Sequence, residues 1–331
     1  MSGRATWWKR LRTASGRLRA RWEAAPVVLM YHRVAEPGPD PSRLAVSPAR
    51  FAEHLEVIRR HLRPLPLRAL VAGLAERRLP RRAAVVTFDD GYADNLHAAR
   101  PLLERHEVPA TVFVVSGAVG RPEGFWWDRL VALLHRGGAL PAAVEVEVGG
   151  ERLALEPRAD PLSARRLLAE RLRPMESAGR EAVLDRLAAA LGASAPHDPE
   201  ARALTADELR ALAADGLVEV GAHTVTHPEL SALSPAAQER EIRESRARLE
   251  ELVGEPVTSF SYPFGGRRQY TPDTVRLVRE AGFASACTTS AALLLPSADP
   301  YRLPRVHVPD CDGDAFARLL SRWTSLAGRG R

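Results

Sequence analysis

Seven short apolar segments rich in β-branched residues alternate with helical segments along most of this 331-residue chain, and this alternation restricts its fold most strongly. Each apolar segment is bounded by turn-forming residues, as is typical of a buried strand. Strands that alternate with helices are usually parallel and joined by crossover helices, so the chain is predicted to be an α/β protein. With so few strands, a barrel or a strongly curved sheet is the expected closure. The predicted strands cover residues 26–32, 83–88, 110–115, 217–223, 257–264, 283–289 and 302–308.

Three of the intervening segments carry recognisable helix boundaries. Two of them begin with Ser-Pro, at Ser47 and at Ser234, and the second is expected to end at Gly254. A third begins at Thr205 and has Glu208 three residues later, which is the spacing of a capping box. In folds of this kind the functional residues gather at the C-terminal ends of the strands.

Residues 121–203 interrupt the alternation and are predicted to form an insertion. A helix is expected around Trp126 and Trp127, and it is followed by an alternating segment around Gly149 that is typical of a hairpin and then by helices rich in Ala, Arg and Leu. Residues 192–202 are expected to form a mobile loop. Two interpretations of the tryptophan pair stay open, namely a platform for stacking on a sugar and a part of the hydrophobic core.

Basic residues are concentrated at the N-terminus. The whole chain has a formal net charge of +6, but residues 1–22 contain seven Arg and Lys and no acid, so the remainder carries −1. This distribution argues against a nucleic-acid-binding protein. Residues 1–25 are interpreted as a basic amphipathic segment compatible with peripheral contact to an anionic membrane, with a solvated terminus as the alternative.

Membrane-spanning and disulfide patterns are not evident in the sequence. No segment reaches the ~20 apolar residues of a membrane span, and no signal-peptide hydrophobic region follows the N-terminal charges. A cytoplasmic location is therefore the expectation. The two cysteines, Cys287 and Cys311, lack metal-site or disulfide spacing, so both are expected to be buried free thiols.

Two pairs of polar residues stand at the ends of predicted strands. Asp89 and Asp90 directly follow the strand at 83–88, and His223 and His227 lie four residues apart at the end of another strand. Either pair alone has an ordinary explanation as turn or capping residues. Together they indicate a site, because two neutral imidazoles and one carboxylate with a position left for water are typical ligands of a catalytic divalent metal.

Three motifs carry a resemblance to a known family. The segments TFDDGY (87–92), HTVTH (223–227) and SYPFG (261–265) resemble those of polysaccharide deacetylases of the NodB-homology type, which are metal-dependent carbohydrate esterases. The resemblance covers residues 26–308. It implies a deformed (β/α) barrel of about seven parallel strands in a domain at 26–331 that contains the insertion, and a polysaccharide or oligosaccharide substrate.

The resemblance also implies roles for individual residues. Asp89 matches the catalytic base of the family, and the metal ligands are expected to be Asp90, His223 and His227. The expected metal is Zn²⁺, with Co²⁺, Ni²⁺ and Mn²⁺ as alternatives. Phe264 matches the position whose backbone N–H helps to bind the oxyanion.

Two features depart from the usual pattern of the family. An arginine normally stands two residues before the proline of the third motif, where this chain has Ser261. Arg305 is a candidate to supply that charge from a neighbouring strand end. Tyr262 and Phe264, which flank the proline of the motif, are expected to contribute to oxyanion or substrate binding together with Arg305.

The C-terminal motif that carries the catalytic-acid histidine is also not evident. A subset of the family, similar to bacterial deacetylases of poly-N-acetylglucosamine exopolysaccharides, carries this histidine after the first strand, and the segment VVLMYHRV fits that subset. His32 is therefore expected to be the general acid, with His307 as the competing candidate. His32 is favoured because it directly follows a fully apolar strand and so lies on the same rim as the two aspartates.

The predicted function is a metal-dependent hydrolase that removes N-acetyl groups from sugars of a bacterial polysaccharide or glycan precursor. One alternative is an O-acetyl carbohydrate esterase of the same fold. The other is a non-catalytic glycan-binding protein, against which the presence of both aspartates and both histidines argues.

Overall fold

The computed structural model describes residues 25–36, 38, 40–121, 124–135, 140–193 and 201–325, with side chains described as far as residue 321. All but the last residue of the basic segment at 1–25 lies outside the described residues. The same holds for most of the loop predicted at 192–202.

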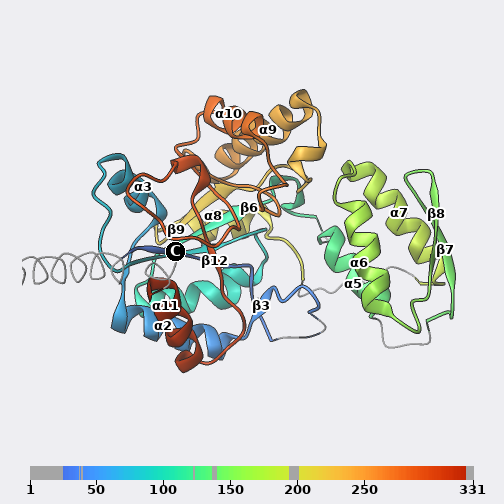
Figure 1. Cartoon of the computed structure of the whole chain (residues 1–331), viewed down its shortest axis with the longest axis horizontal. Coiled ribbons are helices and arrows are strands. Elements are labelled where there is room, and N and C mark those ends of the chain that lie inside the picture. The colour runs from blue at the N-terminus through green and yellow to red at the C-terminus, as the bar shows by residue number, and fades with distance from the viewer. Residues whose placement is uncertain are drawn as a thin grey trace, which may run out of the picture.

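Seven parallel strands form the central sheet in the order β11-β10-β9-β6-β5-β1-β12, which confirms the α/β prediction (Figure 1). Each predicted apolar segment contains one of them. A further short strand, β4 (Arg63–Pro64), pairs with the start of β5. The seven strands are β1 (Val27–Tyr31), β5 (Ala83–Phe88), β6 (Ala110–Val114), β9 (Val218–Ala222), β10 (Ser259–Ser261), β11 (Ser285–Cys287) and β12 (Val306–His307).

The two edges of this sheet are linked to each other. Cys287 in β11 forms a parallel bridge with Leu303, which lies just before β12. The Leu303 N–H donates to the carbonyl of Ala286, and the Thr288 N–H donates to the carbonyl of Leu303. The sheet is therefore strongly curved, as the prediction of a deformed (β/α) barrel requires.

Helices cover the outside of the curved sheet, and their boundaries follow the predicted signals. Ser47 and Ser234 are N-cap residues, Thr205 and Glu208 form a capping box, and Gly254 ends its helix at φ 75°. The helices are α2 (Pro48–His61), α3 (Leu67–Ala75), α4 (Arg100–His106), α8 (Ala206–Ala213), α9 (Pro235–Val253), α10 (Pro272–Glu280) and α11 (Gly313–Ser325), with short turns at Asn95–Ala99, Ser116–Ala118, Leu230–Ala232 and Pro300–Arg302 and a small strand pair, β2 (Arg33–Val34) with β3 (Ala45–Val46).

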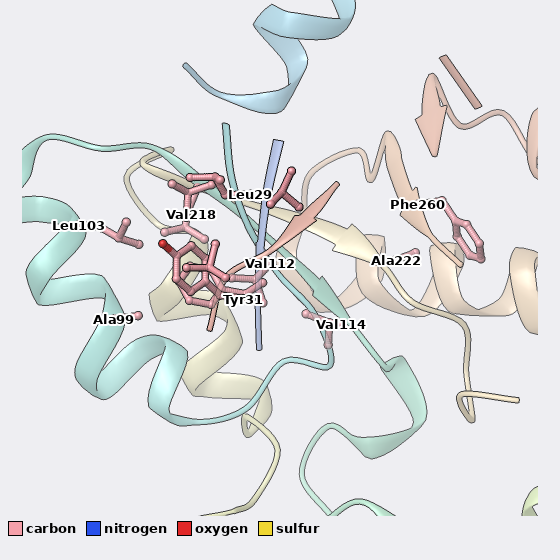
Figure 2. Close-up of a cluster of buried hydrophobic side chains, with 14 of the residues drawn as sticks. Leu29, Tyr31, Ala99, Leu103, Val112, Val114, Val218, Ala222 and Phe260 are labelled. Atoms are coloured by element: carbon pink, nitrogen blue, oxygen red, sulfur yellow. The ribbon is translucent and has the colours of Figure 1, made fainter. Parts of the chain in front are cut away.

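The main hydrophobic core lies between the strands and these helices. Figure 2 shows Leu29, Tyr31 and Val112 from the central strands packed near Leu103 of α4. All five residues of β1 and all six of β5 are buried, which explains why these strands are apolar throughout instead of alternating.

The register between β1 and β5 fixes the position of the polar pairs. Val27 pairs with Ala84, and Tyr31 pairs with Phe88, so the two strands end at the same level. The N–H of Asp89 then donates to the carbonyl of Tyr31 at 3.0 Å. The residues that follow the two strands consequently share one rim of the barrel.

Within the insertion, residues 124–135 and 140–193 form a lobe beside the barrel, which we call the insertion lobe (Figure 1). Its helices and hairpin enclose a separate hydrophobic core that includes Trp126, Val146 and Leu184. Val148 pairs with Glu151 across a turn of two glycines, as expected of the hairpin. The elements are α5 (Trp126–Leu134), β7 (Val144–Val148), β8 (Glu151–Leu155), α6 (Pro161–Leu172) and α7 (Ser177–Ala190).

Two other predictions concern membrane helices and thiols. Among the described helices, none combines the length and the apolar character needed to cross a membrane. Both cysteines are free, and Cys287 is buried as predicted. The prediction of burial was wrong for Cys311, which is partly exposed because it lies in the loop that leads into α11.

Candidate active site

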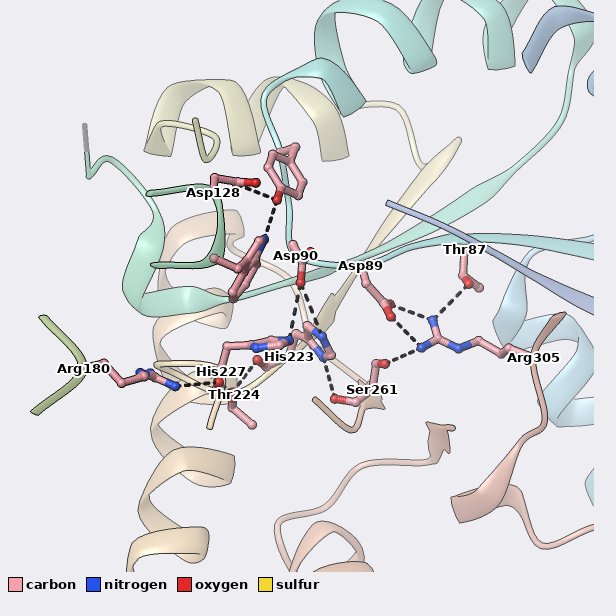
Figure 3. Close-up of polar contacts among 12 residues, drawn as sticks. Thr87, Asp89, Asp90, Asp128, Arg180, His223, Thr224, His227, Ser261 and Arg305 are labelled. Atoms are coloured by element: carbon pink, nitrogen blue, oxygen red, sulfur yellow. Dashed lines mark hydrogen bonds and ion pairs between the residues drawn. The ribbon is translucent and has the colours of Figure 1, made fainter. Parts of the chain in front are cut away.

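Asp89 and Asp90 directly follow β5, and their side chains reach different partners (Figure 3). Asp90 has a positive φ of 73° and Gly91 one of 83°. A Cβ on Gly91 would lie 3.1 Å from a methyl group of Val114, so this turn favours glycine both sterically and conformationally. The reversal at the end of the strand therefore separates two adjacent carboxylates, both of which are buried.

Asp90, His223 and His227 converge on one point, and their potential ligand atoms all lie within 4.8 Å of one another. Nε2 of each histidine lies 3.6 Å from Oδ1 of Asp90. His223 directly follows β9, beside β10, and His227 reaches the same point by way of a tight loop (Figure 3). The sequence prediction of a cluster formed by these three residues therefore agrees with their positions.

The donor set of this cluster fits a divalent metal ion. Nδ1 of His223 lies 2.7 Å from the carbonyl of Ser261, and this contact makes Nδ1 the protonated nitrogen and leaves the Nε2 lone pair toward Asp90. Burial lowers the pKa of both His223 and His227, so both imidazoles are neutral at neutral pH. Burial and the adjacent Asp89 charge raise the pKa of Asp90, which a bound cation would reverse.

Asp89 forms a buried bidentate ion pair with Arg305. Nη1 and Nη2 of Arg305 each donate to one carboxylate oxygen at 2.6 Å, and the arginine is completely buried. Nη2 also donates to Oγ of Ser261 at 2.8 Å, and Nε donates to the carbonyl of Thr288 at 3.0 Å. Burial alone would raise the pKa of Asp89, but the Arg305 charge outweighs it and lowers this pKa to about 2.

This pairing agrees with the hypothesis for the missing arginine of the third motif. Ser261 occupies that position and accepts a hydrogen bond from Arg305, which precedes β12 on the other edge of the sheet. The arginine that pairs with Asp89 thus stands in a different segment of the chain from the third motif.

The two candidate acids lie near each other but in different surroundings. The ring centroids of His32 and His307 are 6.2 Å apart. His32 is largely enclosed, and burial lowers its pKa to about 4, an effect that the neighbouring Asp89 charge opposes. His307 is exposed, and its Nε2 lies 3.1 Å from the carbonyl of Arg43. His32 thus lies close enough to Asp89 to feel its charge, and its role as the acid stays a prediction.

Phe264 and Tyr262 take different positions. Phe264 has a positive φ of 60°, and its ring lies against His227 with centroids 4.8 Å apart. Tyr262 is completely buried, its ring stacks on Tyr270, and its hydroxyl donates to the carbonyl of Tyr301. The structure therefore places Phe264 beside His227 of the Asp90, His223 and His227 cluster, whereas the Tyr262 side chain packs away from it on Tyr270.

A group of residues joins the insertion lobe to the site, and sequence reasoning did not predict the contacts among them. The ring centroids of Trp127 and His227 lie 4.6 Å apart. Trp127 belongs to the tryptophan pair for which the sequence left two interpretations open, a sugar-stacking platform and a part of the hydrophobic core. Its Nε1 donates to the hydroxyl of Tyr92, which in turn donates to Asp128, both at 2.7 Å. One ring face of Trp127 is stacked on Phe125, with centroids 4.7 Å apart, so that face is not open to a sugar.

Arg180 was missed as well. It belongs to α7 of the insertion lobe and donates from Nη1 to the carbonyl of His227 at 3.0 Å (Figure 3). The only available signal was its place in an insertion, because nothing in the surrounding Ala/Arg/Leu-rich sequence distinguishes this arginine from its exposed neighbours.

Comparisons with known proteins agree with this geometry. The sequence profile of the family described as polysaccharide deacetylase matches residues 76–286. YxkH of Bacillus subtilis (strain 168), whose name assigns it to this family, is 20% identical over 296 residues, which are 88% of this chain and 75% of YxkH.

Solved structures share the fold. The deacetylase PplD of Streptococcus pyogenes, in complex with acetate, superposes on this chain with a TM-score of 0.59 at 18% identity. The match covers 89% of this chain and 98% of PplD. IcaB from Ammonifex degensii superposes with a TM-score of 0.59 at 22% identity, and the match covers 91% of this chain and 97% of IcaB. Since the family profile spans most of the chain and these structures share its architecture, this chain belongs to the polysaccharide deacetylase family of hydrolases.

Proposed function

We propose that the protein hydrolyses N-acetyl groups on the sugars of a bacterial polysaccharide or glycan precursor, with a divalent metal held by Asp90, His223 and His227. One observation supports this proposal above all: a carboxylate fixed by a bidentate arginine, Asp89, stands next to a buried carboxylate-imidazole cluster. A glycan-binding protein needs neither a fixed base nor buried metal ligands.

When bound, the divalent ion, proposed to be zinc, supplies Lewis-acid activation of water and of the acetyl carbonyl. The residues of the chain perform the remaining tasks. Asp89 accepts a proton from water as the water oxygen adds to the acetyl carbon. Arg305 keeps this carboxylate ionised and orients both of its oxygens.

The amide C–N bond breaks only if the leaving nitrogen is protonated, and His32 is the proposed donor. Burial lowers the pKa of His32 to about 4, so the resting imidazole is neutral at neutral pH. The proton that Asp89 removes from water must therefore reach His32 before it is delivered to nitrogen. The backbone N–H of Phe264 is proposed to bind the developing oxyanion, a contribution of ~3 kcal/mol for one well-placed donor.

The experiment that tests this proposal compares wild type with Asp89→Asn in an acetate-release assay on N-acetylglucosamine oligomers. Asp89→Asn removes the base but leaves all three proposed metal ligands in place. We expect acetate release to fall by at least about 100-fold, the size of a general-base contribution, while zinc binding measured by calorimetry persists. Equal acetate release by the two proteins would contradict the role of Asp89.

A second comparison separates amide from ester hydrolysis. An O-acetyl group has an alkoxide leaving group that depends less on a proton donor than an amine does. Substitution of His32 by Ala should therefore reduce acetate release from N-acetylated oligosaccharides far more than from O-acetylated ones. If the wild-type protein releases acetate only from O-acetylated sugars, the esterase alternative holds.

A further inference from the structure

Arg180 is a cation from the insertion lobe that is buried against the loop carrying His227. Its side chain is 1% exposed. Nη1 donates to the carbonyl of His227 at 3.0 Å, and Nη2 donates to the carbonyl of Thr226 at 2.5 Å. Both contacts join residues from separate parts of the chain, since α7 belongs to the lobe and the loop belongs to the barrel.

The burial of the charged Arg180 side chain is unfavourable unless hydrogen bonds compensate for the lost hydration. Burial lowers the pKa of its guanidinium to about 10, which the charges of Glu241 and Glu181 partly oppose, so the group stays charged at neutral pH. Glu181 is engaged by Arg129 at 2.7 Å. Removing a charge from water is costly, and here the two terminal guanidinium nitrogens donate to backbone carbonyls of one loop.

The loop that carries His227 has a strained backbone. Thr224 and His227 both adopt positive φ, at 66° and 54°, a region that non-glycine residues rarely occupy. On the side of α9, Glu241 accepts hydrogen bonds from the backbone N–H groups of Val225 and Thr226 at 2.8 and 2.9 Å. Arg180 binds the carbonyl groups of the same loop, so the loop is held by an anion on its N–H groups and by a cation on its C=O groups.

The insertion lobe also contacts the other ligand-bearing segment. Tyr92, two residues after Asp90, donates to Asp128 and accepts from Trp127, both on α5. Trp127 in turn lies against the ring of His227. The lobe is therefore attached to the segments that carry Asp90 and His227, and within the described part of the chain Arg180 is its hydrogen-bond donor to the backbone of His227.

We propose that Arg180 is a positioning residue for the metal centre: the insertion lobe uses its guanidinium to hold the strained loop that presents His227. This inference rests on the proposed metal-dependent function, since it assigns a role toward the same ion. The insertion lobe would then orient a metal ligand, His227, in addition to lying beside the site.

The test measures metal binding instead of catalysis. Zn²⁺ affinity is determined by competition with a chromophoric chelator, and the visible absorption of bound Co²⁺ reports ligand geometry, for wild type, Arg180→Met and Arg180→Lys. Loss of an outer-shell partner typically weakens metal affinity by about 10- to 100-fold. We expect this for Arg180→Met, with an altered Co²⁺ spectrum, and a smaller loss for Arg180→Lys, whose single ammonium keeps the charge but cannot reach both carbonyls in the same way.

Arg129→Met is the matched control. Arg129 joins α5 to α7 through ion pairs with Glu181 and Asp185, so its loss weakens the insertion lobe without touching the His227 loop. Its Zn²⁺ affinity should equal that of wild type. If Arg180→Met does not fold, as judged by circular dichroism, Arg180→Lys decides the question.

The possible outcomes are distinguishable. A folded Arg180 variant with wild-type Zn²⁺ affinity and an unchanged Co²⁺ spectrum overturns the inference. If Arg129→Met loses as much Zn²⁺ affinity as Arg180→Met, the inference is overturned too, because the loss then follows from the stability of the lobe in general. Failure of the wild-type protein itself to bind Zn²⁺ or Co²⁺ would instead overturn the proposed metal-dependent function.

Discussion

Arg305 and Asp89 lie 216 positions apart in the chain and form a bidentate ion pair with both N–O distances at 2.6 Å. Arg305→Met leaves the Asp89 carboxylate buried without a cation. We expect unfolding free energy to fall by about 3–5 kcal/mol, because removal of one partner strands a buried charge. Urea unfolding followed by circular dichroism measures this change.

The control for this substitution is Arg276→Met. Arg276 is half exposed and pairs with Glu280 one turn away on α10, so its loss should change the unfolding free energy by less than ~1 kcal/mol. An Arg305→Met protein as stable as Arg276→Met would show that the buried pair contributes little.

Metal binding should stabilise the native protein through Asp90, His223 and His227. A ligand that binds only the folded state raises stability by about 2.7 kcal/mol at a concentration of 100 times its Kd. We expect thermal unfolding of chelator-treated protein to shift to higher temperature on addition of Zn²⁺, and His227→Ala to abolish that shift. His61→Ala, at an exposed position of α2, should keep it. A full Zn²⁺ shift in His227→Ala would place the ion elsewhere.

Gly117 is packed against the loop that carries His227. A Cβ at this position would lie 2.4 Å from the carbonyl oxygen of Val225, a backbone atom that can move only if the loop moves. Gly117→Ala is therefore expected to lower both the unfolding free energy, by about 1–3 kcal/mol, and the Zn²⁺ affinity.

Ser116→Ala is the neighbouring control for that prediction. The Ser116 hydroxyl is buried and has no hydrogen-bond partner within the described part of the chain, so its removal should be close to neutral in both measurements. Equal behaviour of the Gly117 and Ser116 variants would contradict the argument from close packing.

The two thiols should differ in reactivity. Burial raises the pKa of Cys287 to about 12, so its thiolate is scarce between pH 7 and 9 and its sulfur is inaccessible. We expect iodoacetamide to label Cys311 in the native protein and Cys287 only after denaturation, as mass spectrometry of peptides would show. Labelling of Cys287 at the rate of Cys311 would contradict the described packing of β11.

Much of the barrel could be predicted from the sequence because its determinants are local. Apolar strands bounded by turns, the Thr205–Glu208 capping box and the glycine at 254 each act within a few residues, and all are present in the structure. The cluster of Asp90, His223 and His227 was also accessible, since residues that follow parallel strands meet at one edge of the sheet.

The remaining features depend on contacts that local patterns do not encode. Arg180 and Trp127 reach the centre from an insertion whose placement against the barrel follows from tertiary packing alone. Tyr262 stands in the same motif as Phe264, yet its side chain packs on Tyr270. The chain turns at Phe264, which adopts a positive φ of 60°, so closeness in sequence does not bring the two side chains to the same place. The partial exposure of Cys311 likewise follows from its loop and not from its residue type.

The most direct test of the central claim is acetate release from N-acetylglucosamine oligomers by demetallated protein to which Zn²⁺ is returned in known equivalents. Without metal we expect almost no acetate release, then a linear rise that ends at one ion per chain, and no recovery in a protein with Asp90→Ala. Full acetate release by exhaustively demetallated protein would contradict metal dependence.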